Sequence, residues 1–329
     1  MPIYDKQKLG LEAKELGFQR DTYEKVCRLT DILRYFSEID MLNNHLALKG
    51  GTAINLTVFN FPRLSVDIDL DFTINYQREE MLEKREIINI VIEKYMNAEG
   101  YTKSVKSKVA FSLDSFVYTY VNAGGIRDNI KIETNYSLRT HICEPDEYYL
   151  DSMKYITPLS IRRLNPVEIF ATKIVAFMNR AAARDLYDLS NMVKSDIFDS
   201  SALELLRKCV LFYTAIASTS PSIDLSFERA SDISQHTIKT DLYPVISTAD
   251  RFVLEEEKER VVSFLSKSIS PTEEEKLFLK EFSEGSYKPE LLFDDSEILA
   301  RISNHPMAKW KIQNLKGEND FIRRNPLER

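Results

Sequence analysis

Hydrophobic and polar positions alternate with different periods along the first part of the chain. Residues 20–39 place apolar side chains along one face of a helix, and Asp21 with Glu24 resembles a capping box at its start. Residues 64–74 alternate apolar and polar side chains with a period of two, which predicts a strand. A short helix is expected between them, at 49–60, because Pro62 follows it and two glycines precede it.

Further along, the same criteria predict a helix, a hairpin and then mainly helices. Residues 78–100 form a helical pattern that ends at Gly100, and residues 109–137 predict two strands around the turn NAGG. The stretch 165–193 is predicted to be strongly helical, with Asn165 as N-cap and Glu168 completing a capping box. Another helix starts in SPTEEE, residues 270–275. We therefore expect an α+β protein in which a small mixed sheet with flanking helices precedes a helical remainder.

Composition narrows the class of protein. The 329 residues are 43% hydrophobic and 29% charged, as in ordinary globular proteins. We expect two domains, residues 1–195 and 196–329. The net charge of −7 argues against a wholly basic, nucleic-acid-coating surface but allows a local basic face. Three widely spaced cysteines, no apolar leader and no membrane-length apolar run favour a cytoplasmic protein without membrane contact.

Three aspartates on the predicted strand are the first candidate site. Asp67, Asp69 and Asp71 are two residues apart, so their side chains share one face of a strand. Neighbouring carboxylates repel, and a hard divalent cation such as Mg²⁺ or Mn²⁺ removes that repulsion while leaving positions for phosphate. The alternative is a solvated acidic strand face without a ligand.

The glycine pair upstream adds a second feature. Gly50 and Gly51 allow close backbone approach, and the helix that they open presents free N–H groups to an anion. Arg63 and Ser65, between this turn and the aspartates, supply a charge and a hydroxyl for a triphosphate. A tight turn without a ligand remains the alternative.

A third acid would complete a two-metal site. Glu133 lies on the second strand of the predicted hairpin and shares a face with Lys131. If that strand pairs beside the aspartate strand, Glu133 joins Asp67 and Asp69 as a metal ligand. Otherwise Glu133 is an exposed strand residue.

The predicted helix 165–193 carries further charged candidates. Lys173 is either a phosphate-binding point charge or a lysine that reaches from the helix to solvent. Arg184 and Asp188 are four residues apart, so they form either a surface ion pair or a group in which Asp188 orients Lys173 or Arg184. Basic side chains recur over this segment, and the lysines of 102–109 add to them, as a phosphate or RNA face would require.

These blocks together resemble a known family. KGGTAINL and PRLSVDIDL, followed by KIETNY and RDLYDL, resemble the AbiEii/MenT-type toxins of the polymerase-β-like nucleotidyltransferase superfamily. The motifs cover roughly residues 45–195, and the tail LLFDDSEILARISNHPMAKWK is similar to the C-terminal ends of such proteins. The resemblance implies a polymerase-β-like core and a nucleotidyltransferase toxin of a toxin–antitoxin or phage-defence system. Such an enzyme uses an NTP donor and a divalent metal, and a cognate antitoxin neutralises it.

The resemblance also implies roles for individual residues. Asp67, Asp69 and Glu133 correspond to the metal-binding acids, and Lys173 and Asp188 to later catalytic positions. The nucleotide-binding set is Lys49, Gly50, Gly51, Thr52, Arg63, Ser65, Lys173 and Arg184. Three departures from the family pattern are Thr52, where serine is usual, Arg184, where some relatives have lysine, and the glutamate Glu133 as the third acid.

The acceptor is the least constrained part of this interpretation. Some family members add nucleotides to the 3′ end of tRNA and stop translation, so tRNA or another RNA is the expected acceptor. Transfer to a small molecule such as an antibiotic, and an NTP-binding toxin module without turnover, are the alternatives. The product that carries the label after transfer distinguishes the first two, and the absence of pyrophosphate release marks the third.

Overall fold

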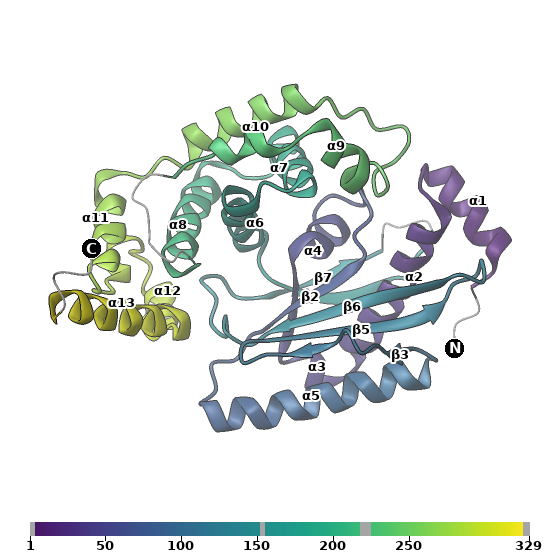
Figure 1. The fold of residues 1–329 in the computed structure, drawn as a ribbon, viewed down its shortest axis with the longest axis horizontal. Helices are drawn as coiled ribbons and strands as arrows, with labels where there is room; N and C mark the ends of the chain where they lie inside the picture. The colour runs from purple at the N-terminus through teal and green to yellow at the C-terminus, as the bar shows by residue number, and fades with distance from the viewer. Residues whose placement is uncertain (1–3, 152–154, 218–224, 325–329) are drawn as a thin grey trace. The chain divides into compact units, whose positions relative to one another are not determined.

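The computed structural model describes residues 4–151, 155–217 and 225–324, and the side chains of the last helix as far as Leu315 (Figure 1). Among the described helices, none combines the length and the apolar composition needed to cross a bilayer.

Contacts divide the chain into two units, which are described separately. The first comprises Met1–Arg139, Glu144–Pro166 and Ser234–Leu254, and the second comprises Thr140–Cys143, Val167–Ile233 and Glu255–Arg329. This division differs from the boundary expected at residue 195. Within the first unit, the amide of Leu64 donates to the carbonyl of Val245 at 2.7 Å, so a late segment returns to the sheet-containing part. Chain order alone could not show that return.

One mixed sheet of eight strands organises the first unit (Figure 1). Its strands run in the order β3-β5-β6-β2-β1-β8-β7, and β4 pairs with β5. The bounds are β1 Leu46–Lys49, β2 Asp67–Phe72, β3 Thr102–Lys103, β4 Lys108–Val109, β5 Leu113–Val121, β6 Arg127–Asn135, β7 Asp146–Leu150 and β8 Leu159–Arg163. The expected α+β class and the predicted hairpin, β5 and β6, are confirmed.

Helices of the first unit flank this sheet, and they include those predicted from sequence. They are α1 Lys6–Leu16, α2 Arg20–Glu38, α3 Asp40–Asn43, α4 Gly50–Thr57, α5 Arg78–Ala98 and α9 Gln235–Thr237. Helix α5 ends at Ala98, two residues before the predicted stop at Gly100, and α4 starts at the glycine pair. Strands β1, β3, β4, β7 and β8 were not predicted, because segments of two to five residues give too few alternations to show a period.

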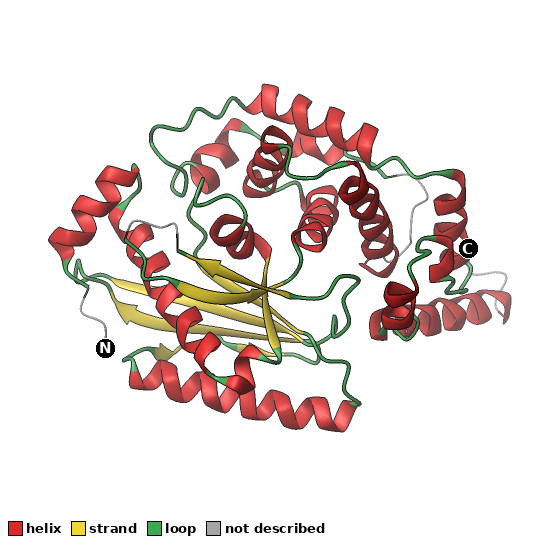
Figure 2. Cartoon of the chain, turned by 180° about the vertical axis from the view of Figure 1, so that it is seen from behind, coloured by secondary structure: helices red, strands yellow, loops and turns green. Residues whose placement is uncertain are grey.

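The two faces of the sheet differ in chemistry. Helices α2 and α5 lie along one face (Figures 1 and 2). On that face Ile68 of β2 neighbours Ile132 of β6, and Arg85 of α5 donates to the carboxylate of Asp114 of β5 at 2.9 Å. The opposite face of β2 and β6 carries the alternate, partly exposed positions, including Asp67 and Glu133. One apolar face therefore anchors the sheet and leaves the other face available for polar side chains.

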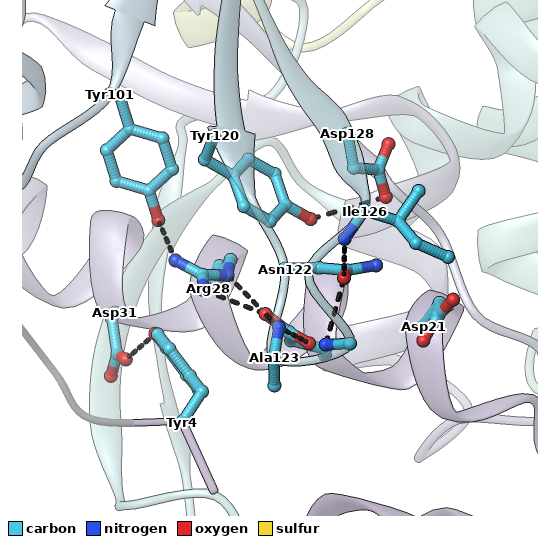
Figure 3. Close-up of polar contacts among 12 residues, drawn as sticks. Tyr4, Asp21, Arg28, Asp31, Tyr101, Tyr120, Asn122, Ala123, Ile126 and Asp128 are labelled. Carbon is cyan, nitrogen blue, oxygen red and sulfur yellow. Dashed lines mark hydrogen bonds and ion pairs between the residues drawn. The ribbon is translucent and has the colours of Figure 1, made fainter. Parts of the chain in front are cut away.

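The turn between β5 and β6 is fastened to α2 through a buried ion pair (Figure 3). Glu24 is fully buried, accepts a hydrogen bond from the Ala123 amide at 2.9 Å and pairs with Arg28 at 2.7 Å. Asn122 closes the turn by accepting from the amides of Gly124 and Ile126, each at 2.9 Å. The predicted Asp21–Glu24 capping box is wrong, because Gln19 is the N-cap and makes no side-chain cap hydrogen bond.

The second unit is helical in its described part. Its helices are α6 Pro166–Arg180, α7 Ala183–Ser195, α8 Ser200–Ala217, α10 Leu254–Ser268, α11 Glu273–Ser283, α12 Ser296–Ile302 and α13 Pro306–Arg324. The stretch 165–193, predicted to be helical, forms two helices separated at Ala181, where φ is 44°. Glu168 accepts from the amides of Ile142 and Cys143, and its predicted capping box with Asn165 stays a prediction. The helix start predicted at 270–275 is confirmed, with Thr272 and Glu275 forming a capping box.

Glu24→Gln is expected to lower the free energy of unfolding by about 3 kcal/mol, because it leaves the largely buried Arg28 guanidinium without its carboxylate. Urea denaturation followed by circular dichroism measures this loss. Glu83→Gln, an exposed position on α5, serves as the control. Equal stability of the two variants would contradict the structural role of the ion pair.

Candidate functional site

The glycine turn lies against the aspartate strand. Gly50 has φ +68°, and a Cβ atom placed on it would lie 2.8 Å from Oδ2 of Asp69. A Cβ atom on Gly51 would lie 2.6 Å from Nη2 of Arg63. A side chain at residue 50 would therefore meet both a strained backbone conformation and a carboxylate oxygen. The glycines allow the start of α4 to approach Asp69 closely.

Thr52, Ser65 and Arg63 brace this turn. The Thr52 side chain is fully buried, and its hydroxyl donates to the main-chain carbonyl of Asp67 and shares a 2.9 Å hydrogen bond with Ser65 Oγ. Arg63 is 2% exposed and donates from Nη1 to the carbonyl of Leu64 at 3.1 Å. All three were predicted to bind nucleotide. In the structure Thr52 connects the helix start to the beginning of β2, Ser65 bonds to Thr52, and Arg63 lies against Gly51.

Lys49 compensates the third aspartate of β2. Asp71 is 1% exposed, and its Oδ1 lies 2.5 Å from Nζ of Lys49. Lys49 is also the cross-strand neighbour of Asp69. Burial raises the pKa of Asp69, the charges of Asp67 and Glu133 add to this rise, and the Lys49 ammonium opposes it. The row of like charges is thus stabilised in part by a lysine from β1.

Glu133 lies beside Asp69 across a parallel strand pair. Strands β2 and β6 pair in the register Asp67↔Lys131 and Asp69↔Glu133, which confirms the strand pairing that the third-acid prediction required. The Lys131 Nζ donates to Oε2 of Glu133 at 2.9 Å. Burial opposes ionisation of Glu133, but hydrogen bonds from Lys131 and Ser115 outweigh it and lower its pKa.

The carboxylates fit a hard cation in chemistry but are not yet gathered around one point. Asp67 and Asp69 offer oxygen donors on one face, as Mg²⁺ and Mn²⁺ prefer. Within the described residues, however, no three His, Cys, Asp or Glu side chains form a group that could hold a metal ion. Glu133 would join such a group after releasing Lys131, so the three-acid metal site stays a prediction.

The second unit contains a separate buried charge cluster. Lys173 of α6 lies 2.9 Å from Oδ1 of Asp185 and 3.1 Å from Oδ2 of Asp188, both on α7. Arg180 binds the other oxygen of Asp185 at 2.8 Å. The contact between Asp188 and Lys173 is consistent with the prediction that Asp188 orients Lys173. Arg184 lies in the first turn of α7, and its predicted phosphate contact is untested.

Three charged residues in these clusters, Lys131, Arg180 and Asp185, were not among the sequence-predicted site residues. Lys131 lies two positions before Glu133 on one strand face, which was the available signal for their contact. Asp185 lies in the first turn of α7, a favourable position for an acid, but its contact with Lys173 depends on the packing of α6 against α7.

Paired carboxylates beside a glycine turn that opens a helix, with a third acid in register, are typical of nucleotidyltransferases. The family model described as "Nucleotidyl transferase AbiEii toxin, Type IV TA system" matches residues 32–284. The chain therefore belongs to the AbiEii nucleotidyltransferase toxin family of type IV toxin–antitoxin systems, and it is a nucleotidyltransferase. This family implies an NTP substrate and an antitoxin partner.

A solved structure supports the same fold. MenT4, a nucleotidyltransferase toxin from Mycobacterium tuberculosis H37Rv, superposes with a TM-score of 0.60 at 16% sequence identity. The match covers 93% of this chain and 98% of that chain. No curated protein sequence matches the chain. The expected AbiEii/MenT-type resemblance and fold class are thereby confirmed.

Lys131→Met is expected to tighten Mn²⁺ binding by roughly tenfold, because it removes a competing positive charge and frees the Glu133 carboxylate. Titration of free Mn²⁺ by electron paramagnetic resonance measures the dissociation constant directly. Lys94→Met, an exposed position on α5, is the matched control. Weaker Mn²⁺ binding in Lys131→Met than in the control would contradict the competition.

Asp185→Asn is expected to cost about 3 kcal/mol of folding free energy at neutral pH, because Lys173 and Arg180 lose a shared carboxylate. Burial opposes ionisation of Asp185, but Lys173 and Arg180 outweigh it, so the folded-state pKa lies below the ordinary 3.8. The stabilisation is therefore complete above pH 3.8 and disappears as the pH falls through the lowered pKa.

Urea denaturation of wild type and Asp185→Asn at pH 7 and at a series of pH values below 4 tests this dependence. The difference between the two proteins should shrink as the pH falls. Asp294→Asn, with a side chain 98% exposed, should show no such trend. A constant difference for Asp185→Asn would contradict the ionic origin of the stabilisation.

Proposed function

We propose that this nucleotidyltransferase transfers a nucleotide from an NTP to the 3′ end of tRNA, or to another RNA, and thereby inhibits translation. One observation carries the proposal: the glycine turn that opens α4 lies against Asp69, and Asp69 has Glu133 beside it in register. The start of α4 can then bind the phosphates of an NTP while the acidic side chains hold the metal ion of the same NTP. Membership of the toxin family supports the inhibitory outcome.

Asp67 and Asp69 are the proposed ligands of Mg²⁺ or Mn²⁺. The ion supplies charge neutralisation of the triphosphate when bound. The backbone N–H groups after Gly50 and Gly51 bind the β- and γ-phosphates, and Thr52 keeps this backbone in place through its hydrogen bond to the Asp67 carbonyl. Catalysis then depends mainly on positioning and on preorganised charge.

The remaining predicted residues have supporting roles in this proposal. Glu133 completes the metal-binding set and accepts the proton of the acceptor hydroxyl as that hydroxyl attacks the α-phosphorus and pyrophosphate leaves. Lys173 and Arg184, with Arg63, Ser65 and Lys49, supply positive charge or hydrogen bonds for the triphosphate. Asp188 orients Lys173, which it contacts at 3.1 Å.

We further propose a biological setting, supported by membership of a toxin–antitoxin family. A cognate antitoxin neutralises the enzyme, and the system acts in phage defence in the cytoplasm, where NTP and tRNA are available. Transfer to a small molecule such as an antibiotic is the competing outcome, and the labelling experiment below includes a readout for it.

Asp69→Ala is expected to reduce nucleotide transfer by at least about a hundredfold, because it removes a metal-binding carboxylate. The fold should persist, since the change relieves repulsion among Asp67, Asp69 and Glu133. The assay incubates the protein with Mg²⁺, each α-³²P-labelled NTP in turn and total tRNA, and separates the products on a denaturing gel. Asp40→Ala, an exposed position on α3, is the control.

Label on tRNA with one NTP, lost in Asp69→Ala and retained in Asp40→Ala, supports the proposal and identifies the donor. Label on a small molecule instead of RNA contradicts the proposed acceptor. Unchanged transfer by Asp69→Ala contradicts the assignment of the site.

A further inference from the structure

Strands β3 and β4 pair one after the other along β5, and residues 102–113, called the ribbon below, form a basic segment at this edge of the sheet. Residues 102–113, TKSVKSKVAFSL, contain three lysines and no acidic residue, although the whole chain has a net charge of −7. Lys106 and Lys108 are both exposed. Local positive charge on an acidic protein requires an explanation beyond solubility, which the net negative charge already provides.

Strand register places Lys108 in the same cross-strand row as the candidate site. Lys108 of β4 pairs with Ser115 of β5, and Ser115 pairs with Glu133 of β6. Glu133 in turn neighbours Asp69 of β2. Side chains directly opposite one another on adjacent strands share a face of the sheet. Lys108 therefore lies on the same face as Asp69, three strand spacings or about 14 Å away.

The three lysines of the ribbon are not equivalent. Lys103 pairs with Tyr118, a buried position, donates to Glu93 of α5 at 2.8 Å and so belongs to the opposite face. For Lys106 and Lys108, the structure shows no side-chain ion pair or hydrogen bond within the residues that it describes. Their charges are thus available to a ligand at the edge of the catalytic face.

The backbone of the ribbon is held in place. The Ser104 amide donates to the carbonyl of Val117 at 2.7 Å, and the Val117 amide donates to Ser107 Oγ at 3.0 Å. The Ser107 amide closes the turn onto the Ser104 carbonyl at 3.0 Å. Lys106 and Lys108 therefore project from a hydrogen-bonded turn, and binding there orders less backbone than binding to a free loop would.

We propose that Lys106 and Lys108 form a docking surface for the sugar–phosphate backbone of the RNA acceptor, a few nucleotides from the reacting hydroxyl. This inference rests on the proposed function. An RNA end placed at Asp69 and Glu133 meets a concentration of negative charge. Lys108 on the same face, with Lys106 in the adjoining turn, offsets that repulsion for the following phosphates. A small acceptor would not extend over the roughly 14 Å that separates Lys108 from Asp69.

The same ribbon also exposes apolar side chains, which would suit a protein partner instead of RNA. The test must distinguish these two occupants. Val105, Val109 and Phe111 are 102%, 68% and 74% exposed, and a protein partner such as an antitoxin would favour such side chains. Val109, however, pairs with Asp114, whose side chain faces α5, so it lies on the other face from Lys108. The position of Lys108 on the carboxylate face therefore favours RNA.

The test compares Lys106→Ala/Lys108→Ala with wild type and with Lys14→Ala/Lys94→Ala, a control of equal charge change at exposed positions of α1 and α5. Binding of fluorescently labelled total tRNA is measured over a range of salt concentrations, together with NTP binding and transfer of α-³²P label. Loss of two phosphate contacts should reduce the slope of log K against log salt by about 1.5. The control variant should keep the wild-type slope, and both variants should keep wild-type NTP affinity.

An unchanged slope for Lys106→Ala/Lys108→Ala in a protein that labels RNA would overturn the docking surface and leave the proposed function intact. Wild-type protein that binds no tRNA and labels a small molecule would overturn both. Weakened antitoxin binding with an unchanged tRNA slope would assign the ribbon to the protein partner instead and likewise overturn the RNA surface.

Discussion

Crowding of carboxylates on one face of a small sheet is the constraint on which the rest of the site depends. Asp67, Asp69 and Asp71 of β2 and Glu133 of β6 occupy that face. Lys49 compensates Asp71, and Lys131 compensates Glu133, each through a direct ion pair. This leaves Asp69, which lies against the glycine turn, and Asp67 on the same strand face, where a cation and a triphosphate would relieve the remaining repulsion.

The fold supports this face from behind. Helices α2 and α5 cover one face of the sheet, where the strands bury apolar side chains and the ion pair of Arg85 and Asp114. Burial holds the strands on this face, while the other face remains polar. The ion pair of Glu24 and Arg28 fastens the β5–β6 turn to α2 and thereby fixes the strand that carries Glu133. A contact remote from the carboxylates thus holds the end of the strand that carries Glu133.

The sequence predicted the parts of this arrangement that depend on local pattern. The period of β2, the hairpin of β5 and β6, and the shared face of the aspartates follow from alternation and from turn residues. The pairing of β6 with β2 was stated as a condition and is met. Short strands such as β1, the return of residues 234–254 to the first unit, and the true partners of Glu24 and Glu168 depend on contacts between distant segments. Strand alternation located Glu133 and placed Lys131 on its face, but the hydrogen bond between their side chains required the structure.

Occupancy of the carboxylate face by metal and nucleotide is the most direct test of the central claim. A crystal structure of the protein with Mn²⁺ and a non-hydrolysable NTP analogue, with anomalous scattering to locate manganese, provides it. The predicted result is manganese bound by Asp67 and Asp69, with the triphosphate at the backbone of Gly50 and Gly51. Manganese and nucleotide bound elsewhere, with this face unoccupied, would contradict it.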